Sequence, residues 1–552
     1  MFWIWFFITA VHFVYAYQGV FKVRGKWLSP AIPLTRQTRS MAVTSTVSAR
    51  SKESTCGGCH LRNLDYNDQL SLKTKLVTVA LKEFSIEAPH VADIIPSVNQ
   101  LNYRNKAQFA IQRDLEGKKV VGLYELNTNI VAGKHVCEIQ HPLVNKVLQQ
   151  FRTFLHHHDV SIYNETTRSG SLRHLVVRVA FKTSEVMVCL VSATHSFTHL
   201  NAFTQAMRAI PQVKSILLHY NPLPGDQVIQ DTTHVSAATE QLVLNSTEYD
   251  GLLTAKAQKT KMRSKIPKTV SLGGRNYILE TIAGVKVKVS LNSFLQSNPL
   301  QTACLYEEVL KCVQDSRGSG TASTSPLDAT KSSATTLQST KFTATIPVTN
   351  EAVKPRVLWD LYCGVGTIGL YLANTPFISH VIGVESVQEA VLDARENAQL
   401  NNITNIHFVQ GLAEEIILSN WFTPGATKAT VDADNPSNQP HITLPALQRN
   451  DIVIVNPPRK GCHVSLLSAL LQRQVRTIVY ISCNPKTMAR DLKILTTPSP
   501  TKAGSEVKKK SNAAKSELEC LYEIKRIQPV DMFPQTTHVE TVVWLERVTS
   551  HK

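Results

Sequence analysis

A glycine-rich turn within residues 357–373, VLWDLYCGVGTIGLYLA, has the residue types and spacing of a ligand-binding loop. An apolar run closes on Asp360, and Gly364, Gly366 and Gly369 follow it. This spacing lets the backbone approach a ligand closely at the N-terminus of a helix, although a tight turn would also explain it. The pattern serves both dinucleotides and S-adenosylmethionine, so it leaves the ligand open.

Four more apolar runs follow, and each leads into polar, glycine or proline residues. Residues 380–384 lead to Glu385, about twenty residues beyond the first glycine, where doubly wound folds place an acid that binds ribose hydroxyls. The other runs are residues 406–410 before Gly411, 451–455 before Asn456-Pro457-Pro458-Arg459, and 477–481 before Ser482-Cys483-Asn484-Pro485. Strands that alternate with helical patterns predict a parallel sheet with its functional residues at the carboxyl ends of the strands. We therefore predict an α/β fold with a Rossmann-like, doubly wound C-terminal domain.

The composition limits the class of protein. With 552 residues and 43% hydrophobic content, the chain can bury two or three domains' worth of core. The formal charge of +17 suits a polyanionic partner such as nucleic acid, although solvated tails explain part of it. The ten cysteines do not sit in a small secreted scaffold, which favours free thiols or metal ligands over a disulfide framework.

The first 52 residues have the composition of a targeting leader. Residues 1–16 are apolar like a secretory signal peptide, and residues 18–52 contain seven Lys or Arg and no acid, as transit peptides do. A signal followed by a transit segment indicates an organelle reached through the secretory pathway, such as a non-photosynthetic plastid. A mitochondrial address, a cytoplasmic location, a membrane anchor and a wrongly assigned first exon are the alternatives. We expect no stable membrane association after the leader is removed.

Short β-like runs at residues 174–181, 186–192 and 215–221 predict a mixed α/β domain ahead of the catalytic one. The predicted domains are residues 1–52, 53–300 and 301–552. Polar inserts near residues 315–350, 423–449 and 498–517 have too little apolar content to pack, and we predict that they are disordered. In the central domain, Arg104, Lys106 and Arg178 are either a basic path for RNA or ordinary exposed strand charges.

Cys56-Gly57-Gly58-Cys59 could be a zinc, iron–sulfur or redox pair. Together with LNYRNKAQFA at residues 101–110 and Cys137 in GKHVCEIQHP, it resembles the RNA uracil-C5 methyltransferase family. In that family four cysteines hold a [4Fe-4S] cluster, and Cys56, Cys59 and Cys137 match three of them. The first ligand is missing, since Ser48 and Arg50 stand where a Cys is expected. The resemblance thus implies an incomplete cluster site with an external or unexpected fourth ligand.

The resemblance covers roughly residues 54–548 apart from the inserts. It includes VSLNSFLQSNP at residues 289–299, similar to the family's S-F-x-Q-x-N segment. It implies S-adenosylmethionine as methyl donor, a class I methyltransferase domain and a uridine of structured RNA, tRNA or rRNA, as substrate. The residues it places at the donor are Gln296, Tyr362, Gly364, Gly366, Glu385 and Asn456.

The same resemblance assigns the reacting groups. Uracil C5 is a weak nucleophile, so the enzyme needs a thiolate that adds to C6 and a base that later removes the C5 proton. Cys483, in S-C-N-P, matches the family's nucleophile, and Glu540, in F-P-x-T-x-H-V-E, matches its general base. A buried structural Cys and a solvated Glu are the alternatives. Cys363, in the glycine turn, is interpreted as a packing residue, and we expect the target base to flip into the pocket.

Two other classes of function remain. Asn-Pro-Pro followed by an aromatic residue marks methylation of amino groups, but here Arg459 follows Pro458. A methyltransferase acting on another base, such as cytosine at C5, is the enzymatic alternative. A catalytically silent protein that binds or folds RNA is the alternative from a different class, and it would be indifferent to loss of Cys483.

Overall fold

The computed structural model describes residues 56–87, 90–133, 136–225, 228–229, 267–316, 356–418, 447–497 and 522–548. The predicted leader and most of the three predicted inserts lie outside these ranges, so the organelle address and the disorder of the inserts stay predictions. No helix within the described ranges is long and apolar enough to cross a membrane.

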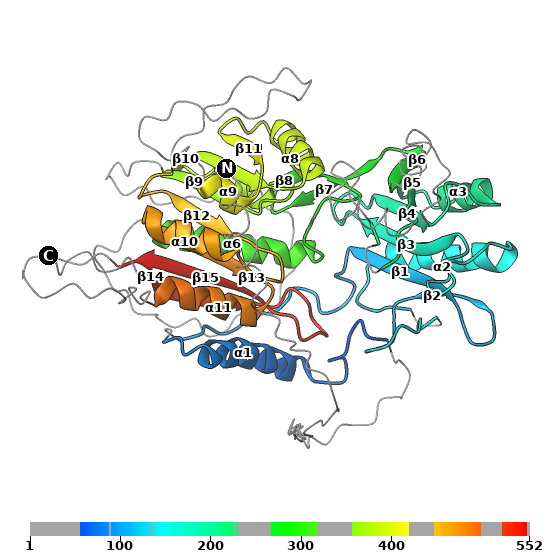
Figure 1. The fold of residues 1–552 in the computed structure, drawn as a ribbon, viewed down its shortest axis with the longest axis horizontal. Helices are drawn as coiled ribbons and strands as arrows, with labels where there is room; N and C mark the ends of the chain where they lie inside the picture. Colours follow the sequence, from blue (N-terminus) through cyan, green and yellow to red (C-terminus); the bar gives the residue numbers. More distant parts are fainter. Residues whose placement is uncertain are drawn as a thin grey trace, which may run out of the picture. The chain divides into compact units, whose positions relative to one another are not determined.

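The C-terminal part is built on a seven-stranded sheet in the order β11-β10-β9-β12-β13-β15-β14 (Figure 1). Its strands are β9 (Arg356–Leu361), β10 (Ile378–Glu385), β11 (Ile406–Gln410), β12 (Ile452–Val455), β13 (Thr477–Ser482), β14 (Tyr522–Val530) and β15 (Glu540–Arg547). Strands β9 to β13 are parallel, whereas β15 is antiparallel and lies between β13 and β14. The five predicted strands are therefore confirmed, and their carboxyl ends meet at one edge.

Helices cover both faces of this sheet, because successive strand residues point to opposite sides. Leu358 of β9 belongs to one core and the next residue, Trp359, to the other. The first core is closed by α6 (Pro299–Asp315), α7 (Thr367–Ala373) and α8 (Gln388–Leu400). The second is closed by α9 (Ala413–Leu418), α10 (Val464–Arg473), α11 (Pro485–Thr496) and the early helix α1 (Tyr66–Glu83). The predicted doubly wound architecture is thus confirmed.

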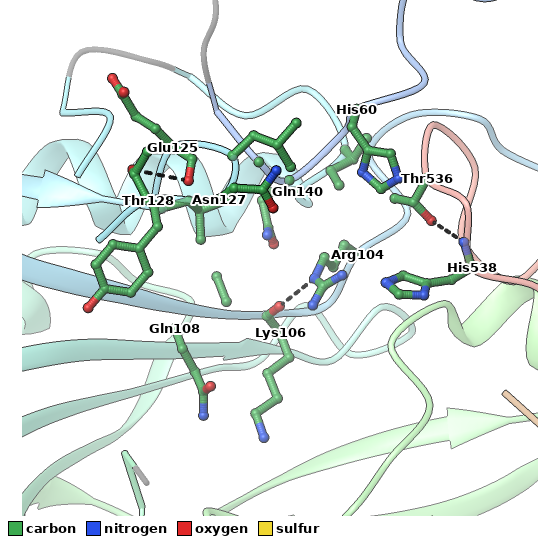
Figure 2. A pocket seen from close by; sticks show the side chains of 17 residues that line it. His60, Arg104, Lys106, Gln108, Glu125, Asn127, Thr128, Gln140, Thr536 and His538 are labelled. Atoms are coloured by element: carbon green, nitrogen blue, oxygen red, sulfur yellow. Dashed lines mark hydrogen bonds between the residues drawn. The ribbon is translucent and has the colours of Figure 1, made fainter. Parts of the chain in front are cut away.

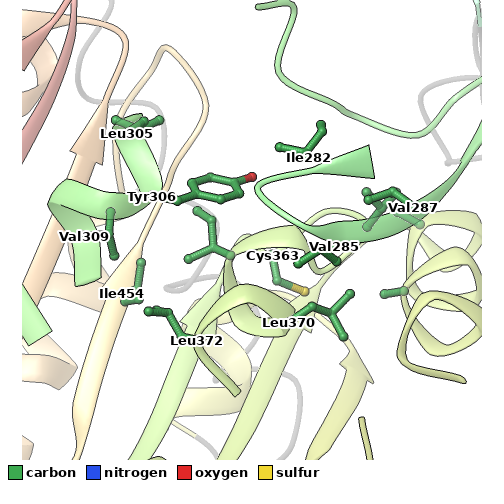
Figure 3. Close-up of a cluster of buried hydrophobic side chains, with 14 of the residues drawn as sticks. Ile282, Val285, Val287, Leu305, Tyr306, Val309, Cys363, Leu370, Leu372 and Ile454 are labelled. Atoms are coloured by element: carbon green, nitrogen blue, oxygen red, sulfur yellow. The ribbon is translucent and has the colours of Figure 1, made fainter. Parts of the chain in front are cut away.

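A separate two-stranded hairpin closes the first core near the glycine turn. It consists of β7 (Tyr277–Ile282) and β8 (Val285–Ser290), and its apolar side chains meet Tyr306 of α6 (Figure 3). Tyr306 is fully buried, and its hydroxyl lies 2.5 Å from the Thr367 hydroxyl at the start of α7. This contact anchors the helix that follows the glycine turn.

The central part is a six-stranded sheet in the order β2-β1-β3-β4-β5-β6. Its elements are β1 (Lys106–Arg113), β2 (Lys119–Gly122), α2 (Pro142–His157), β3 (Leu172–Val179), β4 (Val186–Ser192), α3 (Leu200–Arg208), β5 (Val213–Tyr220) and β6 (Lys268–Gly274). Neighbouring strands are antiparallel except β4 and β5, and α2 and α3 pack on the sheet. The predicted mixed α/β part is therefore present. The boundary near residue 300 stays a prediction, because residues 51–552 cluster as one compact unit.

Candidate active site

The glycine turn connects β9 to α7 through three residues with positive φ. Tyr362, Gly364 and Gly366 have φ of 62°, 56° and 81°, and only glycine enters this region without strain. The Gly364 N–H donates to Glu385 Oε2 at 3.0 Å, and Glu385 Oε1 accepts from the Val387 N–H at 2.9 Å. The structure thus joins the turn to the acid at the end of β10, as predicted.

Gly366 is tightly packed against the core, whereas Gly364 has open space beside it, as the backbone of a ligand-binding turn requires. A Cβ atom at Gly366 would lie 2.4 Å from Phe408 Cζ, inside the core. At Gly364 the nearest atom would be the Phe294 carbonyl oxygen, 3.8 Å away, which leaves room on that side. Phe294 is 63% exposed, and sequence reasoning had not singled it out. Such an aromatic face beside an open glycine turn suits contact with a bound molecule.

Asp360, at the end of β9, holds the start of α7 by a hydrogen bond. It is fully buried, and its Oδ2 accepts from the Gly369 N–H at 2.9 Å, while Oδ1 has no hydrogen-bond partner in the described part of the chain. Burial raises the pKa of Asp360 to about 7. Cys363 is also buried, in the first core, and burial raises the pKa of its thiol well above the usual value. The interpretation of Cys363 as a packing residue is therefore confirmed.

The remaining predicted donor residues come from two other segments. Gln296 is 7% exposed, and its carbonyl accepts from Asn105 Nδ2 at 3.2 Å. It lies two residues after Phe294, so its loop reaches the glycine turn. Asn456 follows β12, and its N–H donates to the Leu361 carbonyl at the end of β9 at 3.3 Å. The predicted donor set therefore gathers at the carboxyl edge of the sheet.

Cys483 and Glu540 meet at the same edge. Ser482 pairs with Thr541 across β13 and β15, so Cys483, one residue later, and Glu540, one residue earlier, are neighbours. Glu540 is fully buried and Cys483 is half-buried. Burial raises the pKa of both groups, to about 8 for Glu540, and Glu540 further raises that of Cys483.

Arg459 completes this pair, and sequence reasoning had noted it only as the residue after Pro458. Its positive charge lowers the pKa of both Cys483 and Glu540. Arg459 Nη2 also lies 3.5 Å from His538 Nε2. A cation near both a thiol and a carboxyl group favours the charged form of each. The signal in the sequence was the absence of an aromatic residue after Asn-Pro-Pro.

The local sequence S-C-N-P fixes the position of the Cys483 thiol at the start of α11. Asn484 caps α11, since its side chain accepts from the Lys486 N–H at 3.1 Å, and Pro485 occupies the first turn. Asn484 Nδ2 also donates to the Arg459 carbonyl at 3.0 Å. The cap thereby ties the Arg459 loop to the segment that carries Cys483.

The segment before Glu540 is held by the N-terminal helix α1. Lys73 and Asp531 form an ion pair at 2.5 Å with both side chains fully buried, and the Tyr66 hydroxyl donates to Asp531 at 2.9 Å. Lys73 also donates to the Phe533 carbonyl at 3.0 Å. The Tyr103 hydroxyl donates to the Pro534 carbonyl at 2.9 Å. These contacts fix the path of the chain into β15.

Comparisons with known proteins agree with this geometry. A family model described as tRNA (Uracil-5-)-methyltransferase matches residues 331–502. An uncharacterized RNA methyltransferase of Halalkalibacterium halodurans is 31% identical over 493 residues, covering 89% of this chain and 81% of the relative. Another, from Listeria innocua, is 30% identical over 492 residues, covering 89% and 82%. This chain belongs to the RNA uracil-C5 methyltransferase family. Its members are S-adenosylmethionine-dependent enzymes.

A solved structure supports the fold of this methyltransferase. The tRNA (uracil-54, C5)-methyltransferase of Pyrococcus abyssi, in complex with S-adenosyl-L-homocysteine, matches with a TM-score of 0.55 and 23% identity. The match covers 90% of this chain and 87% of that chain. It confirms the predicted class I methyltransferase fold.

The cysteine motif of this methyltransferase does not form the expected cluster site. Cys56, Cys59 and Cys137 are buried, and burial, Cys137 and Cys56 together raise the pKa of Cys59 to about 11, so the three thiols lie near one another. Yet within the described ranges no group of three or more His, Cys, Asp or Glu side chains is placed to hold a metal ion. Ser48 and Arg50, where the family's other Cys is expected, lie outside those ranges. The described residues therefore do not support the expected [4Fe-4S] cluster.

Proposed function

We propose that this protein transfers a methyl group from S-adenosylmethionine to C5 of a uridine in structured RNA, tRNA or rRNA, through a covalent adduct between Cys483 and uracil C6. The observation that carries the proposal is the juxtaposition of Cys483, Glu540 and Arg459 at the sheet edge that also holds the glycine turn. A thiol, a carboxyl group and a donor cradle at one edge are what C5 methylation of uracil requires.

The donor cradle fits S-adenosylmethionine. The open side of Gly364 admits a ligand against the backbone, and Glu385 stands at the end of β10, where an acid can accept ribose hydroxyls. Phe294 lies beside Gly364, and the Gln296 and Asn456 segments reach the same edge. When bound, S-adenosylmethionine supplies an electrophilic methyl group.

Cys483 starts the reaction by adding its thiolate to C6, which breaks the C5=C6 double bond and places the electron pair on C5 as an enolate. C5 uses that pair to take the methyl group, while the S–CH3 bond of the donor breaks and its electron pair stays on sulfur, leaving S-adenosylhomocysteine. Glu540 then removes the C5 proton, the C5=C6 bond re-forms, and the C6–S bond breaks to return the thiolate of Cys483. The charge of Arg459 favours the thiolate and the carboxylate that these steps need.

The proposal is tested with the purified full chain, S-adenosylmethionine carrying a labelled methyl group, and total RNA from cells that lack the protein. Mass spectrometry of the digested RNA should find the label in 5-methyluridine and identify the modified RNA. Cys483→Ala should yield none, whereas Cys304→Ala, a matched substitution on α6, should behave as wild type. Label in another nucleoside would show a methyltransferase that acts on another base. RNA binding without methylation would show a catalytically silent RNA-binding protein.

A further inference from the structure

A cavity of about 600 Å³ lies next to the proposed uridine site (Figure 2). It is bounded by the cysteine motif, the start of β1 and the segment before β15, through Gly57, His60, Arg104, Lys106, Gln140 and His538. Its volume falls within the ~300–1,000 Å³ of sites that take small organic molecules, which is enough for one nucleotide. Cys483, Glu540, Gly364 and Glu385 are not among the residues that line it.

The cavity adjoins the reacting groups through His538. His538 lines the cavity, and its Nε2 lies 3.5 Å from Nη2 of Arg459, the residue whose charge lowers the pKa of Cys483. The N–H of Thr537, the residue before His538, donates to His60 Nε2 at 3.1 Å. This bond holds the wall between the cavity and the Cys483 site in place. A strand of RNA with one base at Cys483 therefore has this cavity beside it.

Positive charge concentrates on one wall. Lys106 of β1 is opposite Arg178 of β3 in register, and Arg104 precedes it on the same chain. Within the described ranges no carboxylate forms an ion pair with Arg104 or Lys106, and Arg104 Nε donates only to the Lys106 carbonyl, at 3.2 Å. Glu125 is the one acid that lines the cavity, and it lies on the far wall (Figure 2). This wall suits an anionic group such as a phosphate.

A buried amide side chain lies in the wall of the same cavity. Gln140 lines the cavity with 1% of its surface exposed, and its Oε1 has no hydrogen-bond partner among the residues that the structure describes. A buried amide oxygen without a partner costs roughly 1–3 kcal/mol, and a rotation of the side chain toward the cavity lets this oxygen accept from a donor bound there. The N–H groups on a nucleobase edge are such donors.

We propose that this cavity binds a second, unmodified nucleotide of the RNA next to the target uridine, with its phosphate on Arg104 and Lys106 and its base edge on Gln140. The inference rests on the proposed function for the identity of the neighbouring site. Base-edge contact outside the reacting uridine gives the enzyme a means to select its RNA, whereas the phosphate contact adds affinity.

Lys106 gives the contact a pH dependence. Arg178, burial and Arg104 together lower the pKa of Lys106 to about 7. A bound phosphate favours the protonated amine, so binding takes up a proton and RNA affinity falls as pH rises above about 7. The other charged or titratable groups on the walls around Lys106 are Glu280, His60, Glu125 and His538. Lys106→Arg, which keeps its charge, should flatten this dependence.

The test uses the full chain and a fluorescein-labelled 12-nucleotide oligouridylate, with Kd measured against KCl concentration. Arg104→Gln and Lys106→Gln should each weaken binding about fivefold to tenfold and lower the slope of log K against log[KCl] by ~0.7. Gln140→Met should weaken binding about fivefold without changing the slope, because the lost group is uncharged. Lys146→Gln, an equal charge change on the exposed face of α2, should alter neither quantity.

Unchanged Kd and slope in Arg104→Gln and Lys106→Gln, with folding verified by circular dichroism, would overturn the inference. So would equal losses in Lys146→Gln, which would show a diffuse charge effect. Covalent capture of a 5-fluorouridine oligonucleotide by the wild type is measured in parallel. If capture fails while the binding pattern holds, the proposed function is wrong and the nucleotide cavity stands.

Discussion

Cys483 and Glu540 lie side by side because Ser482 pairs with Thr541 across the antiparallel strands β13 and β15. The two residues are far apart in the chain, and the insertion of β15 between β13 and β14 brings them together. Since β13 ends and β15 begins at the donor edge of the sheet, a shift of the pairing by a single residue would turn one of these side chains away.

Glu540→Gln separates adduct formation from release. The variant keeps Cys483, so it should still add to C6, but without a base the C5 proton stays and the adduct accumulates. We expect turnover to fall by about a thousandfold, within the usual range of general-base effects. A denaturing gel should show a protein–RNA band with ordinary RNA, which the wild type does not accumulate. A variant that turns over normally would exclude Glu540 as the base.

The pH profile of methylation should depend on Arg459. Both reacting groups act in their deprotonated forms, and burial raises the pKa of Glu540 to about 8 and that of Cys483 above its usual value. The rate should therefore rise with pH through about 8. Arg459 lowers both pKa values, so Arg459→Gln should move the rise in rate to higher pH. Arg459→Lys keeps the positive charge and should have a profile close to that of the wild type. Superimposable profiles of wild type and Arg459→Gln would contradict this role.

Glu540 should also cost stability at alkaline pH. Its pKa is raised in the folded state from 4.5 to about 8, so its favourable contribution is complete below about pH 4.5 and is lost as pH rises through 8. Between pH 5.5 and 9, Glu540→Gln should gain roughly 3 kcal/mol in free energy of unfolding relative to wild type. Urea unfolding at the two pH values measures the difference, and a constant difference would show that Glu540 is charged when folded.

The five parallel strands and their polar ends could be predicted because apolar runs and turn residues are local signals. The position of β15 between β13 and β14 could not, since strand order follows from tertiary packing. For the same reason the sequence did not show that Lys73 would pair with Asp531, or that Arg459 would stand beside Cys483. The cluster expectation relied on the match of Cys56, Cys59 and Cys137 to the family's ligands, whereas a metal site also depends on how its ligands converge in the fold.

Gly366→Ala should destroy donor binding. Its φ of 81° strains any side chain, and the new Cβ would lie 2.4 Å from Phe408 Cζ, so the turn must move. Gly117→Ala is the matched control, since Gly117 has a φ of 78° but no atom within 4 Å of the added Cβ. Calorimetry with S-adenosylmethionine should show no binding for Gly366→Ala and normal binding for Gly117→Ala. Normal affinity in Gly366→Ala would place the donor elsewhere.

Lys73→Met should destabilise the protein strongly. It leaves the Asp531 carboxylate buried without its cation, at a cost of roughly 3–5 kcal/mol. Lys118→Met, which breaks the exposed pair with Glu116, should change stability by less than about 1 kcal/mol. Urea unfolding of both variants makes the comparison. Equal, small effects would mean that α1 does not anchor the segment leading to Glu540.

Covalent capture tests the central claim most directly. RNA containing 5-fluorouridine has no removable proton at C5, so an adduct formed by Cys483 and then methylated cannot be released. Wild type, incubated with this RNA and S-adenosylmethionine, should give a protein–RNA complex that survives denaturation, with the nucleotide attached to Cys483 in the peptide mass spectrum. Cys483→Ala should give no complex. A complex in Cys483→Ala, or attachment of the nucleotide at another residue in wild type, would contradict the account.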